Sequence, residues 1–383
     1  MRTNMRSTAC TRVLAAAALG LLLQVASGCA GQAASVEAAA SAQPRTDPLV
    51  LTPVPVVQDG RLKVATPAGR GVVPIHVTRD WSVPQPDVTR AVVVIHGWPR
   101  RDLTSAERAA VEAGPAAQHT VIITPQFLIA ADIEAHHLPG DILRWGRDGW
   151  KTGYDAHGPA PISSFSVVDT IFARLADRRL FPSLEQVVLA GHSAGGQYVQ
   201  RYAAVGRGQA PLLAQGIAIR YVVANPSSYL YFGEARPVAT SAASCPRLNR
   251  WEYGLDGGLP PYVQQPVSVS AIEAHYLAQD IVYLLGTADI DPNHKELDRS
   301  CAAEAQGPTR FARGLDYVAW LRTQSGGHLG QRVLEVPGVG HSSTRMYASP
   351  CGRAALFGRL PDAAPDGANP AADGQCAMAD PPG

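Results

Sequence analysis

From residue 91 onward, short apolar runs alternate with segments in which apolar and polar residues recur at helical spacing. Strands that alternate with helices are typical of a sheet with parallel pairing. The helical patterns lie near residues 105–114, 166–179 and 196–204. The apolar runs that we expect to form strands are 91–95, 121–124, 186–190, 220–224, 280–285 and 332–336.

The region before residue 91 has a different pattern. Its apolar runs 49–57, 61–66 and 72–78 are separated by Asp59-Gly60 and by the glycine-rich stretch 69–71. Short runs divided by turn residues are typical of antiparallel strands, and we predict strands here. We place one folded domain at residues 49–360, which covers both patterns.

Two long segments, about 126–162 and about 227–270, interrupt the alternation. Irregular segments of this length inside a domain are usually functional loops or lids. Both are rich in aromatic residues, among them Trp145, Trp150 and Tyr229. We predict that these three line a substrate cleft. The alternative is that they pack the loops onto the body of the domain.

Length and charge limit the class of protein. The 383 residues can bury a full core, and 46% hydrophobic and 17% charged residues are the proportions of a globular enzyme. The formal net charge is +1 and no long basic run occurs. This balance argues against nucleic acid as a partner.

The N-terminus has the pattern of an export signal. Three arginines precede the apolar run 13–23, and small residues follow it. The run is short for a membrane span, so we predict a signal peptide over residues 1–29, with a short membrane anchor as the alternative. Cleavage before Cys29 would leave a lipidated cysteine, whereas ordinary signal peptidase would release a soluble protein. We expect an extracellular, periplasmic or lipid-anchored protein that meets a bacterial membrane only through this anchor.

Flexible segments flank the predicted domain. Residues 30–48 are rich in Ala, Ser, Gln and Pro and are expected to form a linker. The tail 361–383 is rich in Ala, Pro, Asp and Gly and is expected to be poorly ordered.

Export gives the cysteines a structural meaning. Four remain after the signal: Cys245, Cys301, Cys351 and Cys376. An even number in an exported protein favours two disulfides, and we expect the pairs Cys245–Cys301 and Cys351–Cys376. Free buried thiols are the alternative. The sequence contains no C-x-x-C spacing, so a zinc site is not expected.

The segment 186–196 holds the most specific chemical signal, a G-x-S-x-G turn with Ser193 at its apex. Such a turn between a strand and a helix projects the serine hydroxyl above the sheet edge. Side chains at Gly191 or Gly195 would collide with the neighbouring strand or helix. In a chain with 36 glycines the pattern alone could be an ordinary turn. Its placement, with four apolar residues before it and a helix after it, favours a nucleophile.

A serine nucleophile needs a base, and the base needs an acid. His341 follows the last predicted strand on a glycine-rich loop and is the expected base, whereas His192 is more suited to a structural role. Asp289, just past the strand 280–285, is the expected acid, with Asp291 in reserve. The oxyanion hole is expected to use the backbone N–H groups of Ala194 and Trp98.

Two other patterns suggest metals but lack full ligand sets. His136 and His137 have no clear further ligands nearby. Asp289, Asp291 and Asn293 imitate the start of a calcium loop, but His294 and Ser300 stand where that loop needs glycine and glutamate. We therefore expect no metal.

Taken together, the motifs resemble those of the α/β-hydrolase superfamily over most of residues 50–350. They are H-G-x-P at 96–99, G-x-S-x-G at 191–195, G-x-x-D at 286–289 and G-x-G-H at 338–341. Epoxide hydrolases and dehalogenases share the first motif but carry aspartate where this chain has Ser193. The resemblance implies an eight-stranded, mostly parallel sheet flanked by helices and no cofactor. The irregular segment at 227–270 is then expected to be a lid-like insertion.

The expected function is therefore an exported serine hydrolase. It would cleave a small-molecule or polymeric carboxylic ester through an acyl-enzyme intermediate. A peptidase or amidase with the same triad is one alternative. A non-catalytic binding protein of the same fold is another.

Overall fold

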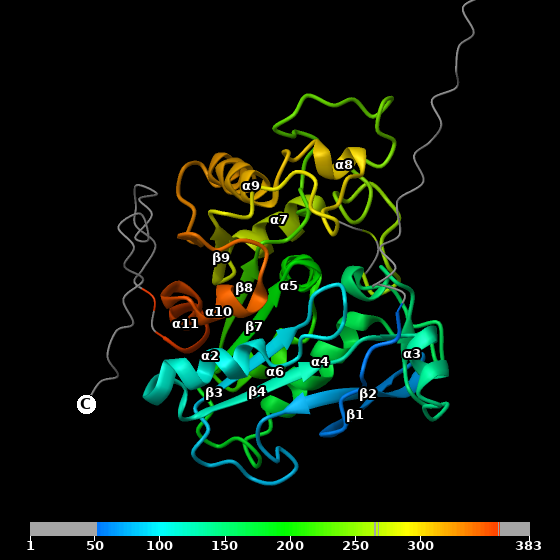
Figure 1. Cartoon of the computed structure of the whole chain (residues 1–383), viewed down its shortest axis with the longest axis vertical. Helices are drawn as coiled ribbons and strands as arrows, with labels where there is room; N and C mark the ends of the chain where they lie inside the picture. The colour runs from blue at the N-terminus through cyan, green and yellow to red at the C-terminus, as the bar shows by residue number, and fades with distance from the viewer. Residues whose placement is uncertain (1–51, 264–265, 267, 359, 361–383) are drawn as a thin grey trace, which may run out of the picture. The chain divides into compact units, whose positions relative to one another are not determined.

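A mixed eight-stranded sheet runs through the part of the chain that the structure describes (Figure 1). The structure is a computed structural model that describes residues 52–263, 266, 268–358 and 360. Across the sheet, the strands follow the order β1 (Gly60–Thr66), β2 (Gly69–Val77), β4 (Thr120–Pro125), β3 (Arg90–Ile95), β7 (Gln186–His192), β8 (Ala218–Ala224), β9 (Ile281–Gly286) and β10 (Arg332–Val336).

Pairing in the sheet is mostly parallel. β1 pairs with β2 and β2 with β4 in antiparallel fashion, and every other neighbouring pair is parallel. The sequence prediction of an eight-stranded, mostly parallel sheet is confirmed. The register places Ile95 opposite Gly191 and His192 opposite Ala224. The carboxyl ends of β3, β7 and β8 therefore meet at one edge.

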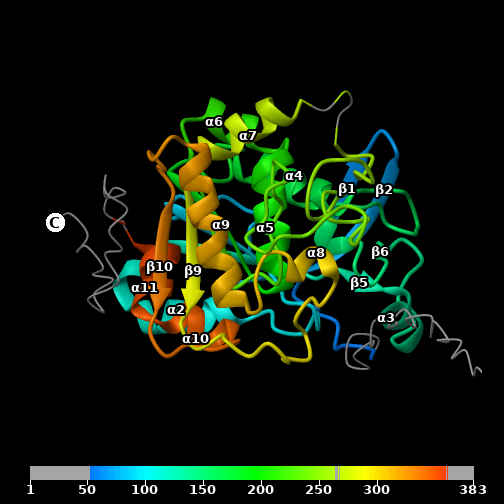
Figure 2. The same ribbon diagram turned by 90° about the horizontal axis from the view of Figure 1, so that it is seen from above.

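Helices cover both faces of the sheet (Figure 2). Along β3, Val92 and Val94 pack toward one face, whereas Val93 and Ile95 pack toward the other. This period of two explains why the strand is apolar from Ala91 to Ile95, since both faces are covered. The first face is covered by α2 (Ser105–Ala113), α10 (Ser343–Ala348) and α11 (Pro350–Phe357); the second by α4 (Ser164–Leu175), α5 (Ala194–Val205), α6 (Gln209–Ala214), α7 (Val269–Leu277) and α9 (Arg310–Gln324).

The two predicted insertions differ in content. The first holds short elements, and the second has no helix or strand among its described residues before α7. The remaining elements are η1 (Gly114–Ala117), β5 (Leu128–Ile129), α3 (Ala130–Ala135), β6 (Arg144–Trp145), η2 (Trp150–Thr152) and α8 (Cys301–Glu304).

The predicted strand at 49–57 is wrong for the residues that the structure describes, 52–57, which are not in a strand. Pro53 and Pro55 lack the N–H group that a strand ladder needs. The neighbouring Val54 N–H donates instead to Asp132 Oδ1 at 3.0 Å, away from any strand. A side-chain acceptor therefore takes the place of the backbone hydrogen bonds that a strand would make here.

Several predictions lie outside the described residues. They concern the signal peptide 1–29 with Cys29, the linker from residue 30, and the tail 361–383 with Cys376. Within 52–263 and 268–358, no helix combines the length and apolar character needed to cross a bilayer.

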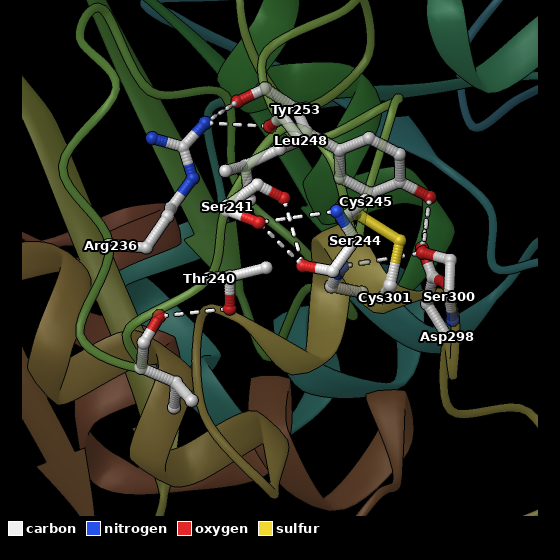
Figure 3. The surroundings of a disulfide bond; sticks show 12 residues. Arg236, Thr240, Ser241, Ser244, Cys245, Leu248, Tyr253, Asp298, Ser300 and Cys301 are labelled. Atoms are coloured by element: carbon white, nitrogen blue, oxygen red, sulfur yellow. Dashed lines mark hydrogen bonds between the residues drawn. A yellow bond between two sulfur atoms is a disulfide. The ribbon is translucent and has the colours of Figure 1, made fainter.

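A disulfide joins Cys245 in the second insertion to Cys301 at the start of α8 (Figure 3). Its Cα atoms are 5.8 Å apart. Beside it, Tyr253 donates to Asp298 Oδ2 at 2.8 Å, and Ser300 Oγ donates to the Tyr253 hydroxyl at 2.9 Å. The predicted first disulfide is therefore present, and hydrogen bonds reinforce the same junction.

The predicted second pair, Cys351–Cys376, has one end in the described chain. Cys351 is buried in α11, whereas Cys376 lies outside the described residues. This pairing stays a prediction.

Candidate active site

Ser193 occupies the turn between β7 and α5. Its backbone has φ +58° and ψ −121°, a conformation that non-glycine residues rarely adopt. The Ser193 N–H donates to Ala224 O on β8 at 2.9 Å, which ties the turn to the next strand. The strain lies on the serine itself, as expected where a fold holds a side chain in an exceptional position.

The two glycines of the motif permit this close packing. A Cβ at Gly195 would lie 2.1 Å from Ile95 O at the end of β3. A Cβ at Gly191 would lie 2.1 Å from Gly195 O. Both distances are far below any real contact and both neighbours are backbone atoms, so the collisions expected from the sequence are present.

Three side chains predicted from separate parts of the sequence meet above the strand ends. His341 Nε2 lies 3.0 Å from Ser193 Oγ. His341 Nδ1 lies 2.7 Å from Asp289 Oδ2. The arrangement is a continuous hydrogen-bonded chain from the hydroxyl to a buried carboxylate.

The loops that carry Asp289 and His341 are bonded to one another. Ala288 N–H donates to Val339 O at 3.0 Å, and Thr287 N–H donates to Val336 O at 3.1 Å. Gly286 has no room for a side chain, because its Cβ would lie 2.3 Å from Val339 O. The backbone contacts therefore fix the position of Asp289 relative to His341 independently of the hydrogen bond between their side chains.

The reserve acid lies elsewhere. Asp291 is exposed, and its Oδ1 accepts from Asn293 N–H at 2.8 Å. Asp289 is only 3% exposed and faces the imidazole. The geometry favours Asp289 over Asp291 as the acid.

Burial controls the protonation of His341. It lowers the pKa of His341 far below the ordinary value of 6.5, and the nearby Arg310 guanidinium lowers the pKa further. The imidazole is thus neutral at neutral pH. With Nδ1–H donating to the carboxylate, Nε2 is left with a lone pair that can accept the serine proton.

Arg310 is a site residue that the sequence prediction missed. It is the first residue of α9, is 1% exposed, and has Nη1 3.5 Å from Asp289 Oδ1. One sequence signal could have drawn attention to it. An arginine in the first turn of a helix opposes the helix dipole and calls for a nearby carboxylate.

Two further histidines flank the base. The His192 ring centroid lies 4.6 Å from that of His341, and the His294 centroid lies 4.9 Å from it. Burial lowers the pKa of His192 well below its ordinary value, so this ring is neutral as well. His192 packs against the base rather than bonding to the nucleophile, which fits the predicted structural role.

The expected oxyanion donors lie on neighbouring segments. Ala194 is the first residue of α5, whose first N–H groups have no acceptor within the helix. Trp98 lies in the turn after β3, and a Cβ on the preceding Gly97 would be 3.9 Å from His192 O. The two segments thus adjoin, as two converging donors require.

A buried histidine holds the Trp98 turn. Burial lowers the pKa of His96 to about 4, so the ring is neutral. Phe127 N–H donates to His96 Nε2 at 3.0 Å, which leaves the proton on Nδ1, and Nδ1 lies 2.8 Å from Gly97 O. This bridge fixes the strand end to the first insertion.

The three aromatic residues predicted to bind substrate lie in the core. Trp145 is 2% exposed, and Trp150 and Tyr229 are fully buried. Trp150 packs 4.6 Å from the His96 ring, and Tyr229 stacks on Tyr317 at 4.4 Å. These positions support the packing alternative.

Among the described residues, no group of three or more His, Cys, Asp or Glu side chains is arranged to hold a metal ion. His136 Nε2 instead lies 2.8 Å from Val54 O.

Comparison with known proteins gives similarity in structure. No protein-family model and no curated protein matches the sequence. The chain is similar to a crystal structure of LpqC, a poly(3-hydroxybutyrate) depolymerase from Bordetella parapertussis, at 24% identity and a TM-score of 0.53, over 80% of this chain and 93% of that one. It is also similar to poly(aspartic acid) hydrolase-1 from Sphingomonas sp. KT-1, at 23% identity and a TM-score of 0.50, over 75% and 94% of the two chains. Identities at this level establish a shared fold.

Proposed function

We propose that this chain, which has the α/β-hydrolase fold, is a serine hydrolase that cleaves carboxylic esters. The observation that carries the proposal is the hydrogen-bonded series Ser193–His341–Asp289, with heavy-atom separations of 3.0 and 2.7 Å. Each member follows a different strand, so the sheet brings together residues far apart in sequence. A strained serine beside a neutral imidazole is a costly arrangement that serves nucleophilic chemistry.

The first half of the reaction forms an acyl-enzyme. His341 Nε2 takes the proton of Ser193 as Oγ attacks the ester carbonyl carbon. The N–H groups of Ala194 and Trp98 stabilise the resulting oxyanion. The carbonyl then re-forms, the ester C–O bond breaks, and His341 gives its proton to the departing alcohol.

The second half releases the acid. His341 takes a proton from water as the water oxygen attacks the acyl carbon. The bond between that carbon and Ser193 Oγ then breaks, His341 returns the proton to Oγ, and the carboxylic acid leaves. Asp289 stays ionised throughout and stabilises the imidazolium that forms twice in each cycle. No cofactor is needed.

An ester is favoured over an amide because an alcohol leaves with less proton assistance than an amine. The two similar structures are named for enzymes that act on polymers. Polymeric substrates therefore belong in the test beside small esters. Peptidase or amidase activity and a non-catalytic binding role are the outcomes that the test must separate.

We further propose that the protein works outside the cytoplasm, either released or held by lipid on Cys29. The Cys245–Cys301 bridge supports this proposal, because disulfides persist mainly in oxidising compartments. Mass spectrometry of the mature N-terminus in a bacterial host distinguishes lipidated Cys29 from ordinary cleavage.

A fluorophosphonate probe tests the enzyme proposal directly. We expect the probe to label the wild type and to leave Ser193→Ala unlabelled. Absence of Ser193-dependent labelling would overturn the proposal in favour of a binding role. A panel of p-nitrophenyl esters, peptide anilides, poly(3-hydroxybutyrate) and poly(aspartic acid) then identifies the bond. Turnover confined to the amides would favour the peptidase or amidase alternative.

A further inference from the structure

We propose that Arg310 is a positioning residue that keeps Asp289 ionised and correctly oriented, an inference that rests on the proposed hydrolase function. Arg310 Nη1 lies 3.5 Å from Asp289 Oδ1, while His341 occupies the other oxygen, Oδ2. The carboxylate is thus held from two sides. Arg310 touches neither the nucleophile nor, in the proposed mechanism, the substrate.

The start of α9 holds Asp289 through the backbone as well. Phe311 N–H donates to Asp289 O at 3.2 Å. Thr309 caps the helix by accepting from Ala312 N–H at 3.2 Å. Two successive residues of the helix therefore contact the acid, one through a side chain and one through the main chain. The positive end of the helix dipole adds to the stabilisation of the carboxylate.

Arg310 is itself held rigidly. Its Nε donates to Ser227 Oγ at 3.0 Å, and its side chain is fully buried. Its Nη1 lies 3.5 Å from Asp289 Oδ1. A buried guanidinium is costly unless its charge is paired, and the carboxylate that it faces is Asp289.

Several titratable groups lie around Asp289 and His341. Besides Arg310 these are His192 and His294, with Glu296 and Arg313 acting on Arg310 itself. Burial raises the pKa of Asp289, and Arg310 opposes this rise most strongly. The two histidines are neutral at neutral pH because burial lowers the pKa of each. Arg310, whose pKa burial lowers only to about 10, is the cation that remains.

The direction of the effect follows from charge alone. A fixed cation makes every proton uptake by the Asp289–His341 pair less favourable. Removing that cation must therefore shift the first protonation of the pair to higher pH, whichever residue receives the proton. A role in packing alone would lower stability without moving this titration.

The experiment compares Arg310→Gln, Arg310→Lys and Arg313→Gln with the wild type. Arg313 is the matched control, since it is buried one helical turn farther along α9 but bonds to Ser227 O, Gly307 O and Asp298 O. We expect Arg310→Gln to lower kcat/KM about 100-fold at neutral pH, the cost of a misplaced catalytic group. We also expect the acid limb of its pH profile of kcat/KM to move to higher pH by about one unit. Arg310→Lys should restore most of the limb position, and Arg313→Gln should leave it unchanged.

Two measurements keep this inference separate from the hydrolase proposal. Probe labelling of the wild type tests the hydrolase proposal alone. Titration of the His341 ring by NMR in Ser193→Ala, with and without Arg310→Gln, tests the role of Arg310 without turnover. An unmoved His341 titration, or an equal shift caused by Arg313→Gln in the same background, would overturn the role of Arg310.

Discussion

At the scale of single residues, the proposed chemistry depends on three side chains that act as one unit. Ser193→Ala and His341→Ala should each reduce kcat by about 10⁶-fold, and the double variant should be little worse than either, because such effects are not additive. Circular dichroism should show both variants folded. Burst and steady-state assays with an activated ester measure the loss.

The same scale separates the two candidate acids. Asp289→Asn should reduce kcat by about 10⁴-fold, since the amide cannot stabilise the imidazolium. Asp291→Asn is the matched control and should retain nearly full activity, because Asp291 is exposed and bonds only locally. If Asp291→Asn lost activity while Asp289→Asn kept it, the acid would be Asp291 instead of Asp289.

The pH profile tests the environment of the base. Burial, followed by Arg310, lowers the pKa of His341 from 6.5, so the base stays neutral as the pH falls through that value. The kcat/KM profile of the wild type should therefore hold its plateau through pH 6.5 and decline only at lower pH. A half-maximal point above pH 6.5 would show that the imidazole is more solvated than the structure indicates.

Residue identities near strand ends could be predicted from the sequence, whereas contacts made through packing could not. Ser193, Asp289 and His341 each follow an apolar run that reads as a strand, and a parallel sheet brings such positions to one edge. Arg310 begins a helix after a loop, and only the packing of α9 against β9 places it beside Asp289. Trp150 shows the same limit, because its residue type indicates an aromatic contact without saying whether the contact is core or ligand.

At the scale of elements, the turn between β7 and α5 depends on its contact with β3. Gly195→Ala would place a methyl group 2.1 Å from Ile95 O and 2.8 Å from His96 O, both backbone atoms. The turn would have to move away from β3, and kcat/KM should fall at least about 100-fold through misplacement of Ser193. A lower Tm should accompany the loss.

The control for this variant is Gly140→Ala, where an added Cβ has open space within 4 Å. It should leave kcat/KM and Tm close to those of the wild type. Wild-type activity in Gly195→Ala would mean that the turn can relax without moving the nucleophile.

Element boundaries were predictable to the extent that periodicity alone determines them. The centres of β3, β7 and β9 are apolar because helices cover both faces, and such runs stand out in any sequence. The failure at 52–57 has a local cause, since Pro53 and Pro55 interrupt the donors of an otherwise strand-like run. The antiparallel edge formed by β1 and β2 could be expected from their separation by Gly69 and its neighbours.

At the scale of the whole molecule, the Cys245–Cys301 disulfide connects the second insertion to the start of α8, which follows the loop that carries Asp289. Closing a loop of 56 residues is worth about 4 kcal/mol in the chain-entropy view. Cys245→Ser with Cys301→Ser should lower Tm by several degrees and reduce kcat/KM, because Tyr253 and Asp298 lose part of the restraint on their contact. Calorimetry and ester turnover measure the two effects.

Reductant provides the control for the disulfide. The double variant should lose less Tm on reduction than the wild type does, since its first bridge is already absent. Equal losses in both proteins would show that the stabilising bridge lies elsewhere.

The edge position of β10 has a consequence for inactivation by heat. Within the part of the chain that the structure describes, β10 pairs with β9 alone, whereas β7 lies between two neighbours. Edge strands open locally at a lower free energy than central ones. Opening of β10 would withdraw His341 while Ser193 kept its strained turn, leaving an intact nucleophile with no base. Such a molecule would retain most of its secondary structure and yet be inactive. The lifetime of the activity at high temperature would then be set by one peripheral strand rather than by the core.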